Sequence, residues 1–219
     1  MEVFKLKIAF LDTGLSFLCT AHKILDNIDC EIHFFTESAE VGMYGEKPGL
    51  IDSWPLIDKN WLGSTFSQEP TVESTAIRHS WFCKAISISL ANRNCFFHLR
   101  TKISEIKSSN VEFVGAGFLG SGNLMFDHII SSNNNTSSKI WFGGTTVDAN
   151  YETTNSFSGI RPDSTIEVWS EKELPSNINW LQLMQWKGTN PKNSIHSEID
   201  IGMKRAYDFL QKKRLLKEI

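Results

Sequence analysis

The stretch Ile8–Glu37, IAFLDTGLSFLCTAHKILDNIDCEIHFFTE, decides the fold of this chain. It opens with four apolar residues, Ile8 to Leu11, which predict a buried strand, and the turn Asp12-Thr13-Gly14 follows. From Leu15 to Leu25 the apolar residues recur at helical spacing, which predicts a helix that packs one face on a sheet. The next apolar run, Glu31 to Thr36, predicts a second strand. The segment is therefore expected to form two parallel strands joined by a helix.

The junction between the first strand and the helix is a candidate site for an anionic nucleotide. A helix that begins directly after a strand points its first unpaired N–H groups and its positive dipole end at a phosphate, and glycine lets the ligand approach the backbone. We therefore expect Asp12, Thr13, Gly14 and Leu15 to contact the phosphates. Glu37 lies 23 residues beyond Gly14. That separation is close to the value of about 20 residues expected for an acidic residue that binds a ribose hydroxyl.

The glycine pattern at this junction is incomplete. A full GxGxxG motif would place glycines at positions 12, 14 and 17, where the chain has Asp12, Gly14 and Phe17. A carboxylate a few ångströms from a pyrophosphate repels it by roughly a kcal/mol or more. The nucleotide prediction would fail if Asp12 bonded to the amides that follow it, or if the Phe17 ring filled the crevice.

Composition limits the class of protein. The 219 residues carry a net charge of −3, and basic residues cluster only between Lys204 and Lys217. Nucleic-acid surfaces need clustered Lys and Arg, so a nucleic-acid partner is not expected. No apolar run reaches the length of about 18 residues that a membrane helix needs, and no signal-peptide pattern opens the chain. We expect a soluble cytoplasmic protein without a membrane partner.

Cysteine and histidine spacing gives no sign of a metal site. The four cysteines and six histidines lack the spacing of a zinc site, and the cysteines are expected to be reduced and mostly buried. Residues 38–70 combine prolines and glycines with aromatic residues, which predicts a long irregular loop, and such loops are commonly functional. We call this segment loop 38–70.

The rest of the chain predicts a mixed fold. A helix is expected over Val72–Asn92, a β-hairpin with a returning strand over 111–130, and an amphipathic helix over Ile199–Ile219. Short extended segments are expected between 140 and 169. The fold class predicted is α/β, a Rossmann-like βαβ unit with a parallel central sheet, a β-hairpin or antiparallel portion and a C-terminal helix. We expect residues 1–219 to form one domain, with loop 38–70 as its excursion.

A second glycine motif is interpreted as a turn. Residues Gly115 to Gly120 spell an intact GxGxxG, but Ser121-Gly122-Asn123 and another apolar strand follow it. No helix N-terminus is therefore expected there to receive a pyrophosphate. We interpret the glycines as the turn of the hairpin.

Taken in order, these elements resemble the flavoproteins of the two-dinucleotide-binding-domain type, which include halogenases, monooxygenases, lycopene cyclases and amine oxidases. The resemblance covers the first forty residues and 71–131. It implies that the first βαβ unit holds the ADP half of FAD, and that Gly202, before the last helix, meets the flavin. The chain would then be an FAD-dependent oxidoreductase acting on a small molecule, with no catalytic residue identified. It is short for that family, which also fits a partner protein or a homo-oligomer.

Two alternatives remain open. Asp12-Thr13-Gly14 with Tyr44-Gly45 is also similar to the opening of glutamate racemases, which implies a cofactor-free amino-acid site with Cys83 as a thiolate acid or base. That chemistry needs two cysteines, and a buried structural role for Cys83 is favoured. The other alternative is a non-catalytic scaffold that has lost its cofactor, in which exposed tryptophans contact a partner.

Overall fold

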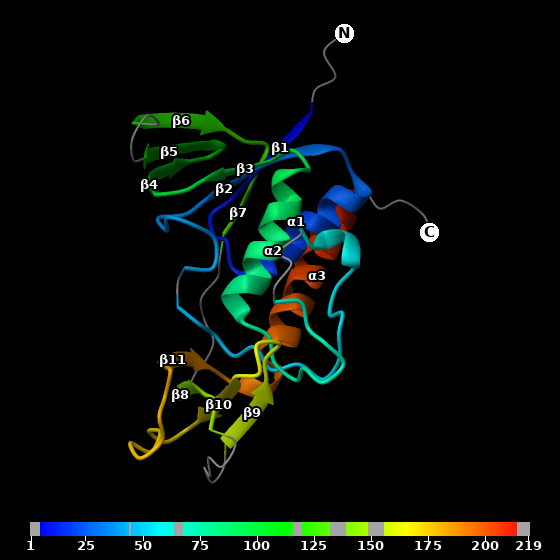
Figure 1. Ribbon diagram of the computed structural model, residues 1–219. Helices are drawn as coiled ribbons and strands as arrows, with labels where there is room; N and C mark the ends of the chain where they lie inside the picture. The colour runs from blue at the N-terminus through cyan, green and yellow to red at the C-terminus, as the bar shows by residue number, and fades with distance from the viewer. Residues whose placement is uncertain are drawn as a thin grey trace.

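The computed structural model describes residues 5–43, 45–63, 68–115, 120–131, 139–148 and 156–213. Its centre is a four-stranded parallel sheet (Figure 1). The strand order is β3 (Cys95–His98), β2 (Cys30–Phe35), β1 (Leu6–Phe10) and β7 (His128–Ile130). Helix α1 (Leu15–Asn27) connects β1 to β2, which pair in parallel. The predicted βαβ unit is confirmed.

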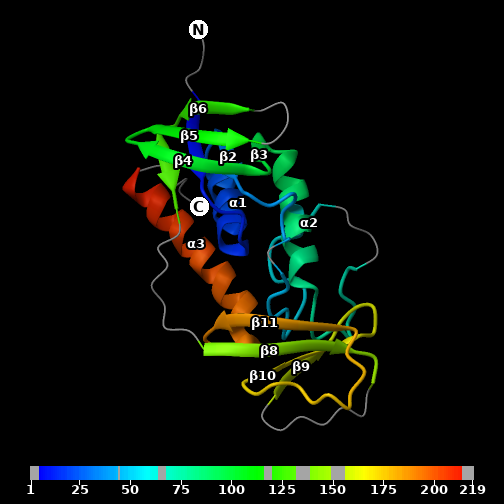
Figure 2. The same ribbon diagram turned by 90° about the vertical axis from the view of Figure 1, so that its left-hand side faces the viewer.

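Both faces of the parallel sheet are buried, as expected of parallel strands covered on two sides. Ile8 and Phe10 belong to the core under the helices, whereas Ala9 and Phe35 belong to a core on the opposite face. On the first side lie α1, α2 (His79–Ala91) and α3 (Ser194–Lys212). The antiparallel meander β4 (Thr101–Lys107), β5 (Asn110–Gly115) and β6 (Ser121–Met125) covers the other side (Figure 2).

A second four-stranded sheet lies at the end of the helices remote from the meander (Figures 1 and 2). It is antiparallel, with the order β11 (Gln182–Gly188), β8 (Lys139–Thr146), β10 (Ile166–Ser170) and β9 (Ser156–Ile160). The sequence predicts short extended segments between 140 and 169, where β8 and β10 lie. The joining of these strands into one sheet is a finding of the structure, because antiparallel pairing across loops leaves no local sequence signal.

Several element boundaries differ from the expectation. Helix α2 begins at His79 rather than Val72, because Ala76 forms a bridge to Leu50 and the Ile77 amide donates to the Gly49 carbonyl at 2.8 Å. Helix α3 begins at Ser194, before the expected Ile199. The predicted hairpin is confirmed by the β5–β6 pairing and by the Gly115 amide, which donates to the Gly120 carbonyl. Residues 116–119, 132–138 and 214–219 lie outside the described part of the chain, and the single domain stays a prediction.

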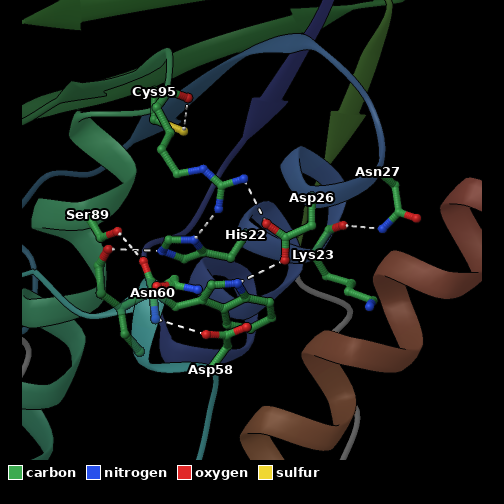
Figure 3. Close-up of polar contacts among 11 residues, drawn as sticks. His22, Lys23, Asp26, Asn27, Asp58, Asn60, Ser89 and Cys95 are labelled. Carbon is green, nitrogen blue, oxygen red and sulfur yellow. Dashed lines mark hydrogen bonds and ion pairs between the residues drawn. The ribbon is translucent and has the colours of Figure 1, made fainter. Parts of the chain in front are cut away.

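Loop 38–70 is anchored on the helices by a polar network, which Figure 3 shows. The Trp61 indole, 5% exposed, donates to Asp26 Oδ2 at 2.9 Å and stacks on the His22 ring. Arg93 donates to the other Asp26 oxygen at 2.7 Å and to His22 Nδ1 at 3.0 Å. Burial, reinforced by the Arg93 charge, lowers the pKa of His22 from 6.5 to about 4. A neutral His22 can therefore accept from Arg93 and donate through Nε2 to the Ile86 carbonyl.

A buried carboxylate joins the same loop to the second sheet. Glu167 on β10 is fully buried, and its Oε1 accepts the Gly49 amide at 2.7 Å. Its Oε2 accepts from Arg161 Nε at 2.8 Å, and its Oε1 also accepts from the Trp169 indole. Loop 38–70 is therefore held at Gly49 and at Trp61.

Candidate functional site

A cavity of about 300 Å³ lies where β1 ends and α1 begins. Three parts of the chain line it: the turn after β1, loop 38–70 and the first turns of α2. The described residues that line it are Leu11, Asp12, Thr13, Gly14, Gly42, Gly45, Lys47, His79 and Cys83. In open α/β sheets, ligands bind outside the carboxyl ends of the strands, so this cavity has the position of a ligand site.

Asp12 makes the contact with which the nucleotide prediction was expected to fail. Its Oδ1 accepts a hydrogen bond from the Gly14 backbone N–H at 2.8 Å. The amide that would face a phosphate is thus engaged by the protein's own carboxylate. Phe17 does not close the crevice, because its ring lies edge-on to Phe10 beneath the Arg205 guanidinium, 4.1 Å from the ring centroid. It is not among the lining residues.

The other predicted site residues have different surroundings. Thr13 lines the cavity, and its buried Oγ1 has no hydrogen-bond partner. Leu15 is fully buried in the core under the helices. Glu37 is exposed beyond the end of β2 and does not line the cavity.

Gly202 lies inside α3, not before it as predicted, at the contact of this helix with α1. A Cβ built on it would meet the Ser16 carbonyl oxygen at 2.4 Å. The Gly202 carbonyl accepts from Thr20 Oγ1 at 3.0 Å. Close packing of α1 against α3 therefore explains why position 202 is a glycine, without a ligand. At Gly14, by contrast, an added Cβ would meet only the Asp12 carboxylate, with Oδ1 at 3.4 Å.

Three residues that line the cavity, Lys47, His79 and Cys83, belong to a chain of ionisable groups that also includes Glu198. Lys47 Nζ lies 3.0 Å from Glu198 Oε1, and Glu198 Oε2 lies 3.7 Å from His79 Nε2. His79 Nδ1 lies 3.7 Å from Cys83 Sγ. His79 and Cys83 are 4% and 2% exposed, and His79 Nε2 has no partner within hydrogen-bond distance. We call these four residues the thiol cluster.

The charges in the thiol cluster support one another. Burial alone would lower the pKa of His79, but the neighbouring Cys83 and Glu198 outweigh it and raise that pKa to about 10. Burial alone would raise the pKa of Glu198, but His79 and Lys47 hold it down at about 2. Pairing with Glu198 also raises the pKa of Lys47 against the effect of burial. Two cations, Lys47 and His79, therefore lie beside the two oxygens of the Glu198 carboxylate.

Sequence reasoning missed the thiol cluster, although one signal was present. His79 and Cys83 are four residues apart, which places them on the same face of a helix. Glu198 comes from α3, more than a hundred residues away, and no local pattern connects it to them. The racemase-like alternative named Asp12, Thr13, Gly45 and Cys83, and these four do line one cavity. Tyr44 lies outside the described residues, and Cys83 is the only cysteine among the described lining residues.

Three further properties follow from the described residues. All four cysteines are buried, as expected, and none of them forms a disulfide. Among the described side chains, no group of three or more His, Cys, Asp or Glu residues could hold a metal ion. None of the helices in the described part of the chain combines the length and apolar character needed to cross a bilayer.

Comparison with known proteins shows the fold. No protein-family model and no curated protein sequence matches the chain. Among solved structures, 98% of this chain aligns with 81% of the p-nitrophenol 4-monooxygenase PnpA from Pseudomonas putida, with a TM-score of 0.66 and 9% identity. A flavoprotein/dehydrogenase from Cytophaga hutchinsonii aligns over 79% of its chain and 95% of this one, with a TM-score of 0.59 and 8% identity.

A further similar structure contains a flavin. It is an aklavinone-11 hydroxylase in a ternary complex with FAD and aklavinone, with a TM-score of 0.60 and 9% identity. The alignment covers 97% of this chain and 64% of that one, and the chain spans 62% and 63% of two other similar structures. The predicted fold class is therefore confirmed: this chain has a mixed α/β architecture similar to that of these structures.

Proposed function

We propose that this chain is an oxidoreductase-like protein that binds FAD weakly and exchangeably at the carboxyl edge of β1 and acts on a small molecule. The main support is the fold, because the similarity to flavoproteins and monooxygenases extends over the parallel sheet and over the antiparallel sheet beyond it. The cavity at the start of α1 lies where such a fold binds its ligand.

The residues at the cavity fit an anionic nucleotide only in part. Thr13 brings an unpartnered hydroxyl, Lys47 brings a positive charge, and the first amides of α1 have no acceptor within the helix. Asp12 does not fit, because it engages the Gly14 amide and adds negative charge. Binding of a pyrophosphate requires this carboxylate to turn away, which costs roughly 1.5–3 kcal/mol for a charged hydrogen bond. That cost is the reason why we propose exchangeable rather than resident FAD.

The test is a titration of the purified protein with FAD. Thermal melting at FAD concentrations from micromolar to about a millimolar should raise the melting temperature in proportion to the logarithm of concentration once the site saturates. ADP should give part of the shift, because the proposed contacts are with the ADP half. If neither compound moves the melting temperature at a millimolar, the cofactor proposal is wrong.

A second candidate is a cofactor-free binding protein that keeps the flavoprotein architecture. One observation favours it: the bond from Asp12 to Gly14 completes the start of α1 without a ligand. In that case FAD would have no effect, and restoring glycine at position 12 would not create binding. Static light scattering with and without added partner proteins would then test the scaffold role.

A further inference from the structure

The thiol cluster is built like a reactive site rather than a structural contact. A buried cysteine in apolar surroundings keeps its proton and is inert, as burial makes it for the other three cysteines. Burial raises the pKa of Cys30 and Cys95 to about 12 and raises that of Cys19 further. Cys83 differs from these three because a histidine lies beside its sulfur and both residues face a cavity.

The remaining members of the cluster act on His79. Glu198 lies at the Nε2 side of the ring, opposite the Nδ1 side that faces Cys83. A carboxylate in that position favours the charged imidazolium and fixes its orientation, as the third group of a nucleophile–base–carboxylate arrangement does. Lys47 pairs with Glu198 and balances its charge. Because this pairing keeps the Lys47 amine protonated, sulfur rather than nitrogen is the nucleophile available in the cavity.

We propose that Cys83, activated by His79 and oriented through Glu198, is a nucleophilic thiol site for a small carbonyl compound that enters the cavity at the end of β1. The Cys83 sulfur bonds to the carbonyl carbon, and the π electron pair of the C=O bond moves to its oxygen. The one proton that Cys83 Sγ and His79 Nδ1 share moves to that oxygen, so the S–H or N–H bond that held it breaks and an O–H bond forms. The products are a hemithioacetal and a neutral histidine, so no further reactant is consumed and the adduct is reversible.

This inference goes beyond flavin binding and does not depend on it, because the measurement needs no FAD. The first experiment treats the folded protein with iodoacetamide, which forms a carbon–sulfur bond and releases iodide, and maps the modified cysteines by peptide mass spectrometry over time. We expect Cys83 to be alkylated at least about tenfold faster than Cys19, Cys30 and Cys95, because only the thiolate is nucleophilic. Equal rates for all four cysteines would overturn the proposal.

Variants distinguish activation of Cys83 by His79 from simple access of iodoacetamide to Cys83. His79→Gln keeps a polar side chain but removes the imidazole beside the Cys83 sulfur. We expect this variant to slow Cys83 alkylation about tenfold or more. Glu198→Gln should slow it less and should change the pH at which the rate falls, because Glu198 acts through His79. Cys19→Ser is the matched control, since it removes a neighbouring buried thiol and should leave the Cys83 rate unchanged. If His79→Gln does not fold, the pH profile of Glu198→Gln decides the question.

The carbonyl assignment has its own test. Pre-incubation with propanal at about millimolar concentration should slow the alkylation of Cys83 but of no other cysteine, and dilution should restore the rate because a hemithioacetal dissociates. Propanal that leaves the alkylation of Cys83 unchanged would overturn the assignment of a carbonyl ligand. Alkylation at the same rate in the wild type and in His79→Gln would overturn the role of the cluster.

Discussion

The carboxylate of Asp12 accepts the backbone N–H of Gly14 at 2.8 Å, at the place where a dinucleotide fold presents that amide to a phosphate. The fold and this contact favour different candidate functions: the fold favours FAD binding, and the contact favours a cofactor-free protein. The architecture is similar to that of an aklavinone-11 hydroxylase found in complex with FAD, whereas Asp12, the first residue of the turn after β1, supplies its own anion to the Gly14 amide. Removing the Asp12 carboxylate therefore separates the two candidate functions.

Asp12→Gly should strengthen FAD binding. The variant frees the Gly14 amide and removes a repulsion of roughly a kcal/mol or more, so we expect the dissociation constant to fall about tenfold. Asp12→Asn is the control, because it removes the charge but keeps an acceptor for Gly14, and its effect should be smaller. Isothermal titration of the wild type and both variants measures this. Identical affinities in all three proteins would show that Asp12 does not oppose the nucleotide.

The two glycines that the sequence assigned to the cofactor should behave differently. Gly202→Ala places a Cβ 2.4 Å from the Ser16 carbonyl oxygen, so we expect a loss of about 1–3 kcal/mol in the free energy of unfolding. Gly14→Ala meets only the mobile Asp12 carboxylate and should change stability little, while narrowing the cavity and weakening ligand binding. Urea denaturation of both variants makes the comparison. Equal stability losses would contradict the packing role of Gly202.

The sequence predicts the parallel core well because its signals are local. The apolar run before Asp12, the helical spacing after Gly14 and the next apolar run each fit within one element, and all three were confirmed. The hairpin around Gly115–Gly120 was predicted for the same reason. The second antiparallel sheet could not be predicted in this way, because its strands meet across loops and β11 pairs with β8 rather than with its neighbour in sequence.

Only the part of the site that comes from the turn after β1 was predicted from the sequence. The turn Asp12-Thr13-Gly14 does line the cavity, since a strand followed by a helix fixes the position of the residues between them. Lys47, from loop 38–70, lines the cavity, and Glu198, from α3, reaches Lys47 through tertiary packing. Their contact joins residues 151 positions apart, for which neither periodicity nor spacing gives a signal.

Stability should fall as the pH drops below about 6.5. The pKa of His22 is about 4 in the folded protein, because of burial and Arg93, and 6.5 when unfolded. Between these values the unfolded chain binds a proton that the native protein does not bind. The stability from neutral His22 is thus present above 6.5 and lost as the pH falls toward 4, by about 3 kcal/mol at most. Burial also lowers the pKa of His98 and His33, which adds to the trend.

Urea denaturation at pH 7, 6 and 5 tests this, because carboxylates contribute little to the slope in that range. His79 has the opposite sign: its folded pKa is about 10, so its contribution is complete below 6.5 and is lost as the pH rises through 10. His22→Gln should flatten the slope between pH 7 and 5. If the slope of that variant equals that of the wild type, His22 is not its source.

Glu167 should be among the most sensitive positions in the second sheet. Its carboxylate is fully buried and accepts from Gly49, Trp169 and Arg161, so Glu167→Ala leaves three donors without an acceptor and Arg161 without a counter-charge. We expect a loss of about 3–5 kcal/mol, the usual result of removing one partner of a buried ion pair. Glu167→Gln keeps an acceptor for Gly49 and should cost less.

Glu171→Ala is the matched control, because Glu171 pairs with Lys139 in the same sheet but both side chains are more than half exposed. The free energy of unfolding of Glu171→Ala should fall by no more than about 0.5 kcal/mol, as for other surface ion pairs.

The hydrogen bond from the Gly49 amide to Glu167 also predicts a consequence outside the second sheet. When Glu167 is lost, loop 38–70 is released at Gly49, two residues from Lys47, so alkylation of Cys83 should change in Glu167→Ala and stay constant in Glu171→Ala. An unchanged Cys83 rate in a folded Glu167→Ala protein would show that the loop keeps Lys47 in place without this anchor.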